Sequence, residues 1–166
     1  MAIEVDLVRH GESIFNALNI YQGASQDSSL SETGIKQAEN LARKLVSRNY
    51  AGIYSSPLKR ACLTAKIIKQ RQKNQPAIYT EGWLKELDHG DIGAMKVSEI
   101  KKKYPKEWET WLKSPAKTSP HFPGGQILTQ ESEMACKRLN FLVSLWEDES
   151  KILIVSHGAK IKIIVM

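Results

Sequence analysis

The sequence predicts an α/β fold, a single three-layer α/β/α domain built around a mostly parallel sheet. Three observations lead to this fold class. The chain has 166 residues, about the length of one domain. Its composition, 42% hydrophobic and 25% charged, is that of a globular protein. Short apolar runs alternate along the chain with segments of helical periodicity, a pattern typical of helices packed on a parallel sheet.

The first strand is expected at residues 3–8, where apolar residues alternate with acidic ones. It runs into Arg9 and His10, and the glycine that follows ends it. A helix is expected to follow from Ser31, which can cap it, because apolar residues recur at three- and four-residue spacings through residues 35–46.

A second short strand is expected at residues 52–56. Pro57 suits a helix start, and small or apolar residues then mark an inward face through to about Arg71. Residues 77–80 are expected to form a third strand. The chain thus repeats strand and helix in the order that a parallel sheet requires.

Residues 87–125 differ in character and are expected to form a cap-like excursion from the domain, which spans residues 1–166. The lysine run at 101–103, with Trp108 and Trp111, has two interpretations. It is either a lid that selects anionic substrates or a solvated helix face whose tryptophans pack on the core, and the second is preferred.

The last elements are a helix at residues 134–146 and a strand at 151–156. The helix is expected to turn Met134 and the apolar residues that follow it inward. The strand is apolar on both faces, which suits a strand covered on both sides. The chain then ends in an apolar run at 161–166, so C-terminal elements of the fold are expected to be missing. Homo-oligomer formation through that uncovered edge is also expected.

Polar side chains follow three of these strands, at the edge of the sheet where α/β proteins bind ligands. His10 and His157 each stand between a strand and a glycine, and His10 also follows Arg9. Arg60 lies in the first turn of a helix, where a cation is unfavourable unless an anion is near. Taken singly, each is as consistent with an ordinary core or surface residue. Together they predict a cationic pocket for a dianion such as a phosphoryl group.

An ordered series of motifs over nearly the whole chain resembles the histidine phosphatase superfamily, the phosphoglycerate mutase-like proteins, and within it the phosphatase branch. The resemblance implies a mostly parallel α/β sheet flanked by helices, in agreement with the periodicity. The matching motifs are Leu7-Val8-Arg9-His10-Gly11-Glu12-Ser13, Asn16, Gln22-Gly23, Leu30-Ser31 with Gly34 and Gln37-Ala38, Ser55-Ser56-Pro57-Leu58 with Arg60-Ala61 and Thr64-Ala65, Leu84 with Glu86, Pro123-Gly124-Gly125, and Ser156-His157-Gly158.

By position, the resemblance implies that His10 is the nucleophile and that Arg9, Arg60 and His157 hold the phosphoryl oxygens. It makes Glu86 the proton donor, which then activates water to hydrolyse the phosphohistidine. Nearby guanidinium groups disfavour protonation of His10 and so keep it nucleophilic. Positioning and charge supply most of the catalysis of phosphoryl transfer, so neither a metal nor another cofactor is expected.

The loop after the nucleophile offers further donors to the phosphate. An amide, a hydroxyl and backbone groups stand there, and they belong to Ser13, Asn16, Gln22 and Gly23. We expect these residues to contact the phosphate as well. Mutases and phosphatases of the family share this pattern, so it does not separate the two activities.

The expected function is that of a phosphomonoesterase acting on small phosphorylated metabolites. The family's mutases are generally longer, and residues 84–93 resemble the phosphatase pattern. Two alternatives stay open: phosphoglycerate mutase-type phosphoryl transfer, and a phospholigand-binding or interaction module with little turnover. The chain departs from the family at Gln126, where Glu is frequent, and at Ile92, where an aromatic residue is usual. Because of these two departures, the resemblance does not predict the natural substrate.

Other classes of function find little support in the sequence. The net charge of +6 could favour polyanions, but aromatic platforms and a recognition-helix pattern for nucleic acid are missing. Histidines and cysteines do not stand at metal-ligand spacing. The chain shows neither a signal peptide nor an apolar run long enough for a membrane span, and its two cysteines fit a reducing compartment. A cytoplasmic protein with a small phosphorylated substrate is therefore expected.

Overall fold

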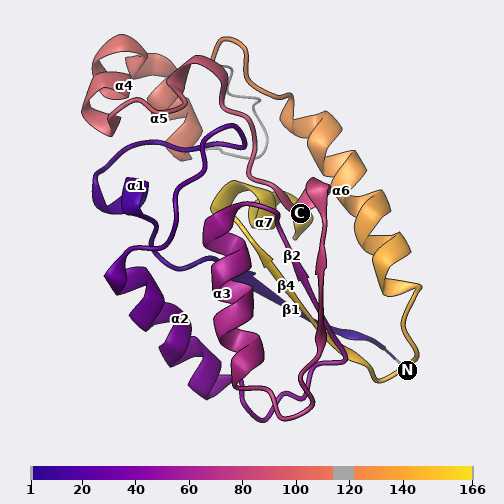
Figure 1. Ribbon diagram of the computed structural model, residues 1–166. Helices are drawn as coiled ribbons and strands as arrows, with labels where there is room; N and C mark the ends of the chain where they lie inside the picture. The colour runs from indigo at the N-terminus through magenta and orange to yellow at the C-terminus, as the bar shows by residue number, and fades with distance from the viewer. Residues whose placement is uncertain (1, 114–121, 166) are drawn as a thin grey trace.

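The computed structural model, described here for residues 2–113 and 122–165, is built around a parallel sheet (Figure 1). The strands are β1 (Glu4–Arg9), β2 (Gly52–Ser55), β3 (Ala77–Thr80) and β4 (Lys151–Ser156). They form a four-stranded sheet in the order β1-β4-β2-β3, and every pairing is parallel. The predicted α/β fold class is therefore confirmed, and each expected strand forms.

The register brings the carboxyl ends of the strands together at one edge. Arg9 pairs with Ser156, and Ser55 pairs with Val155, so β1, β2 and β4 end at the same level. The residues that follow these strands, including His10 and His157, therefore emerge side by side although they are far apart in the sequence. The pattern of strand ends thus creates the site.

Helices cover both faces of the sheet (Figure 1). On one face lie α2 (Glu32–Lys44) and α3 (Lys59–Gln70), and on the other lie α6 (Leu128–Val143) and α7 (Gly158–Ile164). The central strand β4 supplies both cores, because its apolar side chains alternate between the two faces. Leu153 and Val155 join the α2–α3 core, whereas Ile152 and Ile154 join the α6–α7 core.

A third group of elements lies over the carboxyl ends of the strands. It contains the short helices α1 (Ile14–Ala17), η1 (Gly82–Leu84), η2 (Gly90–Ile92), α4 (Val97–Lys103) and α5 (Pro105–Lys113). Buried Ile92, Ile100 and Phe122 form its own small core. We call the segment from Gly90 to Gly125 the cap; its residues 114–121 lie outside the described part of the chain.

The cap resolves the two interpretations of its lysines and tryptophans. Trp108 and Trp111 pack against the cap core, and Trp111 also reaches the α6–α7 core. The three lysines at 101–103 are exposed at the end of α4. The preferred prediction, a solvated face with packed tryptophans, is therefore confirmed.

Two details of the predicted helices are wrong. Met134 is 49% exposed, because the inward face of α6 runs through Leu128, Ala135 and Leu142 at seven-residue intervals. Met134 alone is misplaced: it stands about 100° around the helix from Ala135, which the prediction also turned inward and which is buried. Pro57 also lies outside α3, which begins at Lys59.

The start of α2 comes unusually close to the loop after β1. Ser31 caps the helix by accepting a hydrogen bond from the backbone N–H of Gly34 at 3.0 Å. A Cβ on Gly34 would lie 1.9 Å from the carbonyl oxygen of Glu12. Only a glycine lets the helix pack directly on the backbone that follows His10, so α2 supports the loop from beneath.

Within residues 2–113 and 122–165, no helix has both the length and the apolar character needed to cross a lipid bilayer. The protein buries its apolar surface in the two sheet cores and the cap core instead.

Candidate active site

A cavity of about 350 Å³ opens where the sheet meets the cap. Its floor is formed by residues that follow the strands, and its walls come from α1, the cap and α7. The predicted site residues on its surface are Arg9, His10, Asn16, Gln22, Arg60 and Glu86. Six of the nine predicted residues are therefore brought to one cavity from distant parts of the chain.

His10 lies at the floor of this cavity with its side chain mostly buried. Its Nδ1 is 2.6 Å from the carbonyl oxygen of Gly11. A carbonyl oxygen only accepts, so Nδ1 carries the proton and Nε2 keeps a free electron pair. Burial, with Arg60 and Arg9 nearby, lowers the pKa of His10 to about 4 although the Gly11 contact opposes this. His10 is therefore neutral and nucleophilic at physiological pH.

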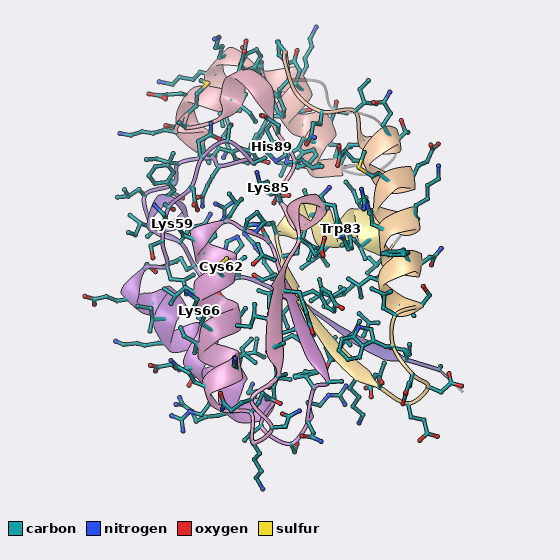
Figure 2. All side chains as sticks on the ribbon, turned by 45° about the vertical axis from the view of Figure 1, so that its right-hand side comes forward. Lys59, Cys62, Lys66, Trp83, Lys85 and His89 are labelled. Atoms are coloured by element: carbon teal, nitrogen blue, oxygen red, sulfur yellow. The ribbon has the colours of Figure 1, made fainter. Side chains whose placement is uncertain are left out.

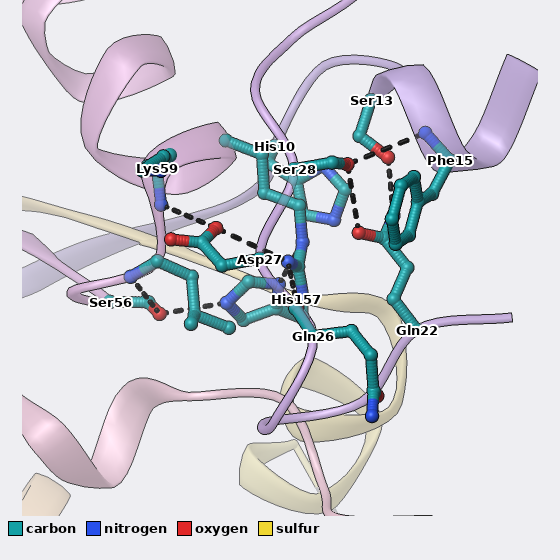
Figure 3. Close-up of polar contacts among 12 residues, drawn as sticks. His10, Ser13, Phe15, Gln22, Gln26, Asp27, Ser28, Ser56, Lys59 and His157 are labelled. Atoms are coloured by element: carbon teal, nitrogen blue, oxygen red, sulfur yellow. Dashed lines mark hydrogen bonds and ion pairs between the residues drawn. The ribbon is translucent and has the colours of Figure 1, made fainter. Parts of the chain in front are cut away.

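His157 lies behind His10 and does not line the cavity. The two rings are 4.9 Å apart between centroids, and Figure 3 shows Ser56 on the far side of His157. Arg60 donates from Nε to Nδ1 of His157 at 3.2 Å, so the proton must sit on Nε2, which is 2.8 Å from Ser56 Oγ. Burial, followed by the nearby charge of Arg60, lowers the pKa of His157 to about 2.

Arg60 is a buried cation at the start of α3, with 1% of its surface exposed. It donates to the carbonyl oxygens of Gln26 at 3.0 Å and Gly23 at 3.4 Å, and Asp27 lies 3.7 Å away. Burial lowers its pKa, and the carboxylates of Glu86 and Asp27 oppose that effect. The guanidinium is held from several sides and forms a fixed positive charge beside His10.

Arg9 is the second cation of the site. Its side chain is exposed to the cavity, and within the described part of the chain it forms no ion pair or hydrogen bond. Its guanidinium lies over Gly158, where an added Cβ would be 3.6 Å from its Cζ. An unpaired arginine beside a buried one makes the cavity a site for an anion with several oxygens.

Glu86 lines the same cavity as His10 and belongs to the loop after η1. Its carboxylate accepts from the backbone N–H groups of Leu87 at 3.0 Å, Lys160 at 3.1 Å and Ala159 at 3.3 Å. These contacts fix the carboxylate against the first turn of α7. Glu86 is therefore a carboxylate held in one place at the cavity wall, not a solvated loop carboxylate.

The predicted site residues in the loop after His10 fall into two groups. Asn16 and Gln22 line the cavity, whereas Ser13 is fully buried and hydrogen-bonds to both of them. Gly23 is buried and presents its carbonyl to Arg60. Of the nine predicted residues, Ser13, Gly23 and His157 thus contact other site residues instead of the open cavity.

Sequence reasoning missed most of the residues that shape the outer cavity. The cap and its neighbours contribute Tyr21, His89, Val97, Trp111 and Leu112, and α7 contributes Lys162. Figure 2 shows His89 beneath the helices of the cap. Burial lowers the pKa of His89 and raises that of Tyr21. Two of them carried a signal: His89 stands in the motif-like segment around Glu86, and Trp111 belonged to the alternative interpretation of the cap as a lid.

The cavity suits a phosphoryl group by charge and by donor geometry. Arg9 and Arg60 supply positive charge, Asn16 and Gln22 supply amides, and His10 supplies an imidazole whose Nε2 is free. In the described ranges, which omit residues 114–121, no three His, Cys, Asp or Glu side chains are grouped as metal ligands.

Comparison with known proteins agrees with this geometry. Residues 5–166 match the profile of the histidine phosphatase superfamily, branch 1. The chain belongs to this superfamily. The resemblance inferred from the motifs is thereby confirmed.

Relatives within the histidine phosphatase superfamily include both phosphatases and mutases. Phosphoserine phosphatase 1 of Hydrogenobacter thermophilus is 40% identical over 126 residues, which are 76% of this chain and 57% of the relative. Probable phosphoglycerate mutase GpmB of Proteus mirabilis is 35% identical over 158 residues, which are 94% and 70% of the two chains. The solved structure of Bacillus stearothermophilus YhfR has a TM-score of 0.88 at 28% identity, with coverage of 99% and 78%.

Proposed function

We propose that this protein is a phosphomonoesterase that hydrolyses small phosphorylated metabolites through a phosphohistidine intermediate. One observation carries the proposal: the Nδ1–H of His10 is donated to the Gly11 carbonyl, which leaves Nε2 free in a cavity that also holds Arg9 and Arg60. A neutral imidazole beside two guanidinium groups is suited to attack phosphorus and to bind the charge that the transfer shifts onto oxygen.

In the first step, His10 Nε2 attacks the phosphorus atom and the bond to the ester oxygen breaks. Glu86, in its protonated form, gives its proton to the departing alkoxide, which leaves as an alcohol. Arg9 and Arg60 hold the other phosphoryl oxygens through this step, together with the amides of Asn16 and Gln22.

In the second step, Glu86 is a carboxylate and takes a proton from water. The resulting hydroxide attacks phosphorus, the P–N bond breaks, and its electron pair returns to His10 Nε2. Inorganic phosphate leaves, and Glu86 is again protonated. Because the guanidinium groups supply the positive charge, neither step calls for a metal ion.

His157 supports this chemistry from behind the nucleophile. It accepts from Arg60 Nε and donates to Ser56 Oγ, so it holds Arg60 in place while remaining neutral. In the proposal, His157 and Ser13 keep the phosphate-binding groups aligned.

The mutase name of one relative makes phosphoryl transfer to a second acceptor the other candidate activity. A mutase keeps water from the phosphohistidine until an acceptor arrives, whereas a phosphatase admits it. The name of the 40% identical relative and the carboxylate poised for water activation favour hydrolysis here. The alignment covers 57% of that relative, so its activity is proposed and not transferred to this chain.

The proposed setting is cytoplasmic. Cys62 and Cys136 are both free thiols, which suits a reducing compartment. A small phosphorylated substrate, and not nucleic acid, is the proposed partner. Self-association through residues 161–166 stays a prediction.

The test is phosphate release from a panel of phosphomonoesters. The wild-type chain is expected to hydrolyse 4-nitrophenyl phosphate and at least one metabolite on the panel, and His10→Ala is expected to lose all measurable turnover. Glu81→Gln, outside the cavity, serves as the control and keeps wild-type activity. Turnover by His10→Ala would refute the assignment of the nucleophile. Exchange of phosphate between two acceptors, with little release, would favour the mutase.

A further inference from the structure

A buried ion pair lies directly behind Glu86, outside the substrate cavity. Lys160 in α7 is 3% exposed, and its Nζ is 2.7 Å from Glu131 Oε2 in α6. Both residues line a second cavity, of about 360 Å³, which Glu86 also borders. Glu86 therefore stands between the two cavities, with the ion pair on the side away from the substrate.

A first set of hydrogen bonds connects this ion pair to Glu86 through α7. The backbone N–H of Lys160 donates to Glu86 Oε1 at 3.1 Å, and that of Ala159 donates to Oε2 at 3.3 Å. The side chain of Lys160 fastens the same turn of α7 to α6 through Glu131. The position of the two N–H donors therefore depends on the ion pair.

A second set of hydrogen bonds connects the ion pair to the backbone just after Glu86. Glu131 Oε1 accepts from Gln126 Nε2 at 2.9 Å, and Gln126 Oε1 accepts from the backbone N–H of Asp88 at 2.7 Å. The N–H of Gln126 also donates to the carbonyl of Asp88 at 2.9 Å. Gln126, which departs from the family pattern, thus ties the Glu86 loop to the same carboxylate that holds Lys160.

Stability alone is a poor reason for such an arrangement. The desolvation of a buried ion pair largely cancels its attraction, and apolar residues of similar volume often replace it at no cost. What the pair does provide is fixed geometry, because each side chain has to lie close to particular atoms of its partner. Here the pair is connected to the Glu86 carboxylate in two ways, through the backbone of α7 and through Gln126.

We propose that Lys160 and Glu131 are positioning residues that hold Glu86 at the distance and angle needed for proton transfer. The proposal rests on the phosphatase activity proposed above. Neither residue touches the substrate; both act through Glu86. A misplacement of about 1 Å is enough to reduce catalysis by a group such as this one, so loss of the pair weakens proton donation without removing the acid.

Substrates whose leaving groups differ in their need for a proton from Glu86 can distinguish a positioning role from a general structural role. Phenyl phosphate and 4-nitrophenyl phosphate have similar shapes, but nitrophenolate is the more stable leaving group and needs less help from Glu86. A variant that disturbs only the placement of Glu86 therefore slows phenyl phosphate more than 4-nitrophenyl phosphate. A variant that disturbs the whole site slows both by the same factor.

The variants are Lys160→Met and Glu131→Gln in the full chain, with kcat/KM measured for both esters. Exposed residues of α6 provide matched controls, Lys137→Met and Glu133→Gln. We expect both test variants to lose roughly tenfold more kcat/KM on phenyl phosphate than on 4-nitrophenyl phosphate. The controls are expected to lose nothing on either ester.

Glu131→Gln keeps the shape of the side chain and an acceptor for Gln126, so it carries the test if Lys160→Met fails to fold in a thermal unfolding scan. Equal losses on the two esters, or no loss, would overturn the proposal and leave the phosphatase assignment intact. A wild-type chain that hydrolyses neither ester would overturn the phosphatase assignment and, with it, the positioning role.

Discussion

At the residue scale, the two histidines of the site differ in tautomer although their sequence settings are alike. Each follows a strand and precedes a glycine. His10 donates from Nδ1 to a carbonyl, whereas His157 accepts at Nδ1 from Arg60 and carries its proton on Nε2. The neighbours therefore leave Nε2 of one imidazole free and make the other an acceptor for Arg60.

These tautomers give a direct spectroscopic prediction. Imidazole nitrogen NMR of the ligand-free protein is expected to show His10 protonated on Nδ1 and His157 on Nε2, both neutral from pH 8 down to pH 5. The reason is that burial and guanidinium charges lower their pKa values to about 4 and about 2. Titration of either ring with a midpoint near the ordinary value of about 6.5 would contradict this account.

At the element scale, the packing of α2 on the nucleophile loop is the feature most sensitive to a single atom. In an exposed helix, Gly→Ala normally stabilises by up to about 1 kcal/mol. At Gly34 the added methyl would overlap the Glu12 carbonyl, so the sign reverses. Overpacking of this kind costs about 1–3 kcal/mol.

Gly34→Ala is therefore expected to lower the free energy of unfolding by about 2 kcal/mol and to reduce kcat at least about tenfold, because the loop after His10 has to move. Thr33→Ala, at the exposed neighbouring position, is the control and is expected to stay within about 0.5 kcal/mol of wild type. Chemical denaturation and steady-state kinetics measure both effects. A stabilised, fully active Gly34→Ala would show that the helix does not support the loop.

Most of the secondary-structure elements, and part of the site, could be predicted from the sequence. Strands β1 to β4 and helices α2 and α3 follow from periodicity and turn residues, because each is a regular element that belongs to the sheet or packs on one of its faces. His10 and His157 follow because they come directly after strands, whereas Glu86, Asn16 and Gln22 were predicted only through the family resemblance. The outer cavity does not follow, since Trp111 and Leu112 reach it only through the docking of the cap. Local pattern carries no information on such docking.

At the scale of the whole molecule, the buried neutral histidines couple stability to pH. The pKa values of His10 and His157 are lower in the folded protein than the unfolded value of about 6.5. Unfolding in mild acid therefore takes up protons. Their stabilising contribution is complete above pH 6.5 and is lost as the pH falls below it.

Between pH 7.5 and pH 5.5, the free energy of unfolding is expected to fall by about 2–3 kcal/mol from these two residues. This window lies above the range in which most carboxylates titrate. Urea denaturation at several pH values measures the change. A free energy of unfolding that stays constant over the window would mean that both rings are protonated as easily in the folded protein as in the unfolded chain.

The central claim is that His10 carries the phosphoryl group, and direct trapping of the intermediate tests it most closely. The wild-type chain is mixed with 4-nitrophenyl phosphate, denatured within milliseconds in alkali, and digested for mass spectrometry under alkaline conditions. The account predicts a phosphate group on His10 that is stable in alkali and lost in acid. Phosphate on another residue, or a protein that releases phosphate without ever carrying it, would contradict the account.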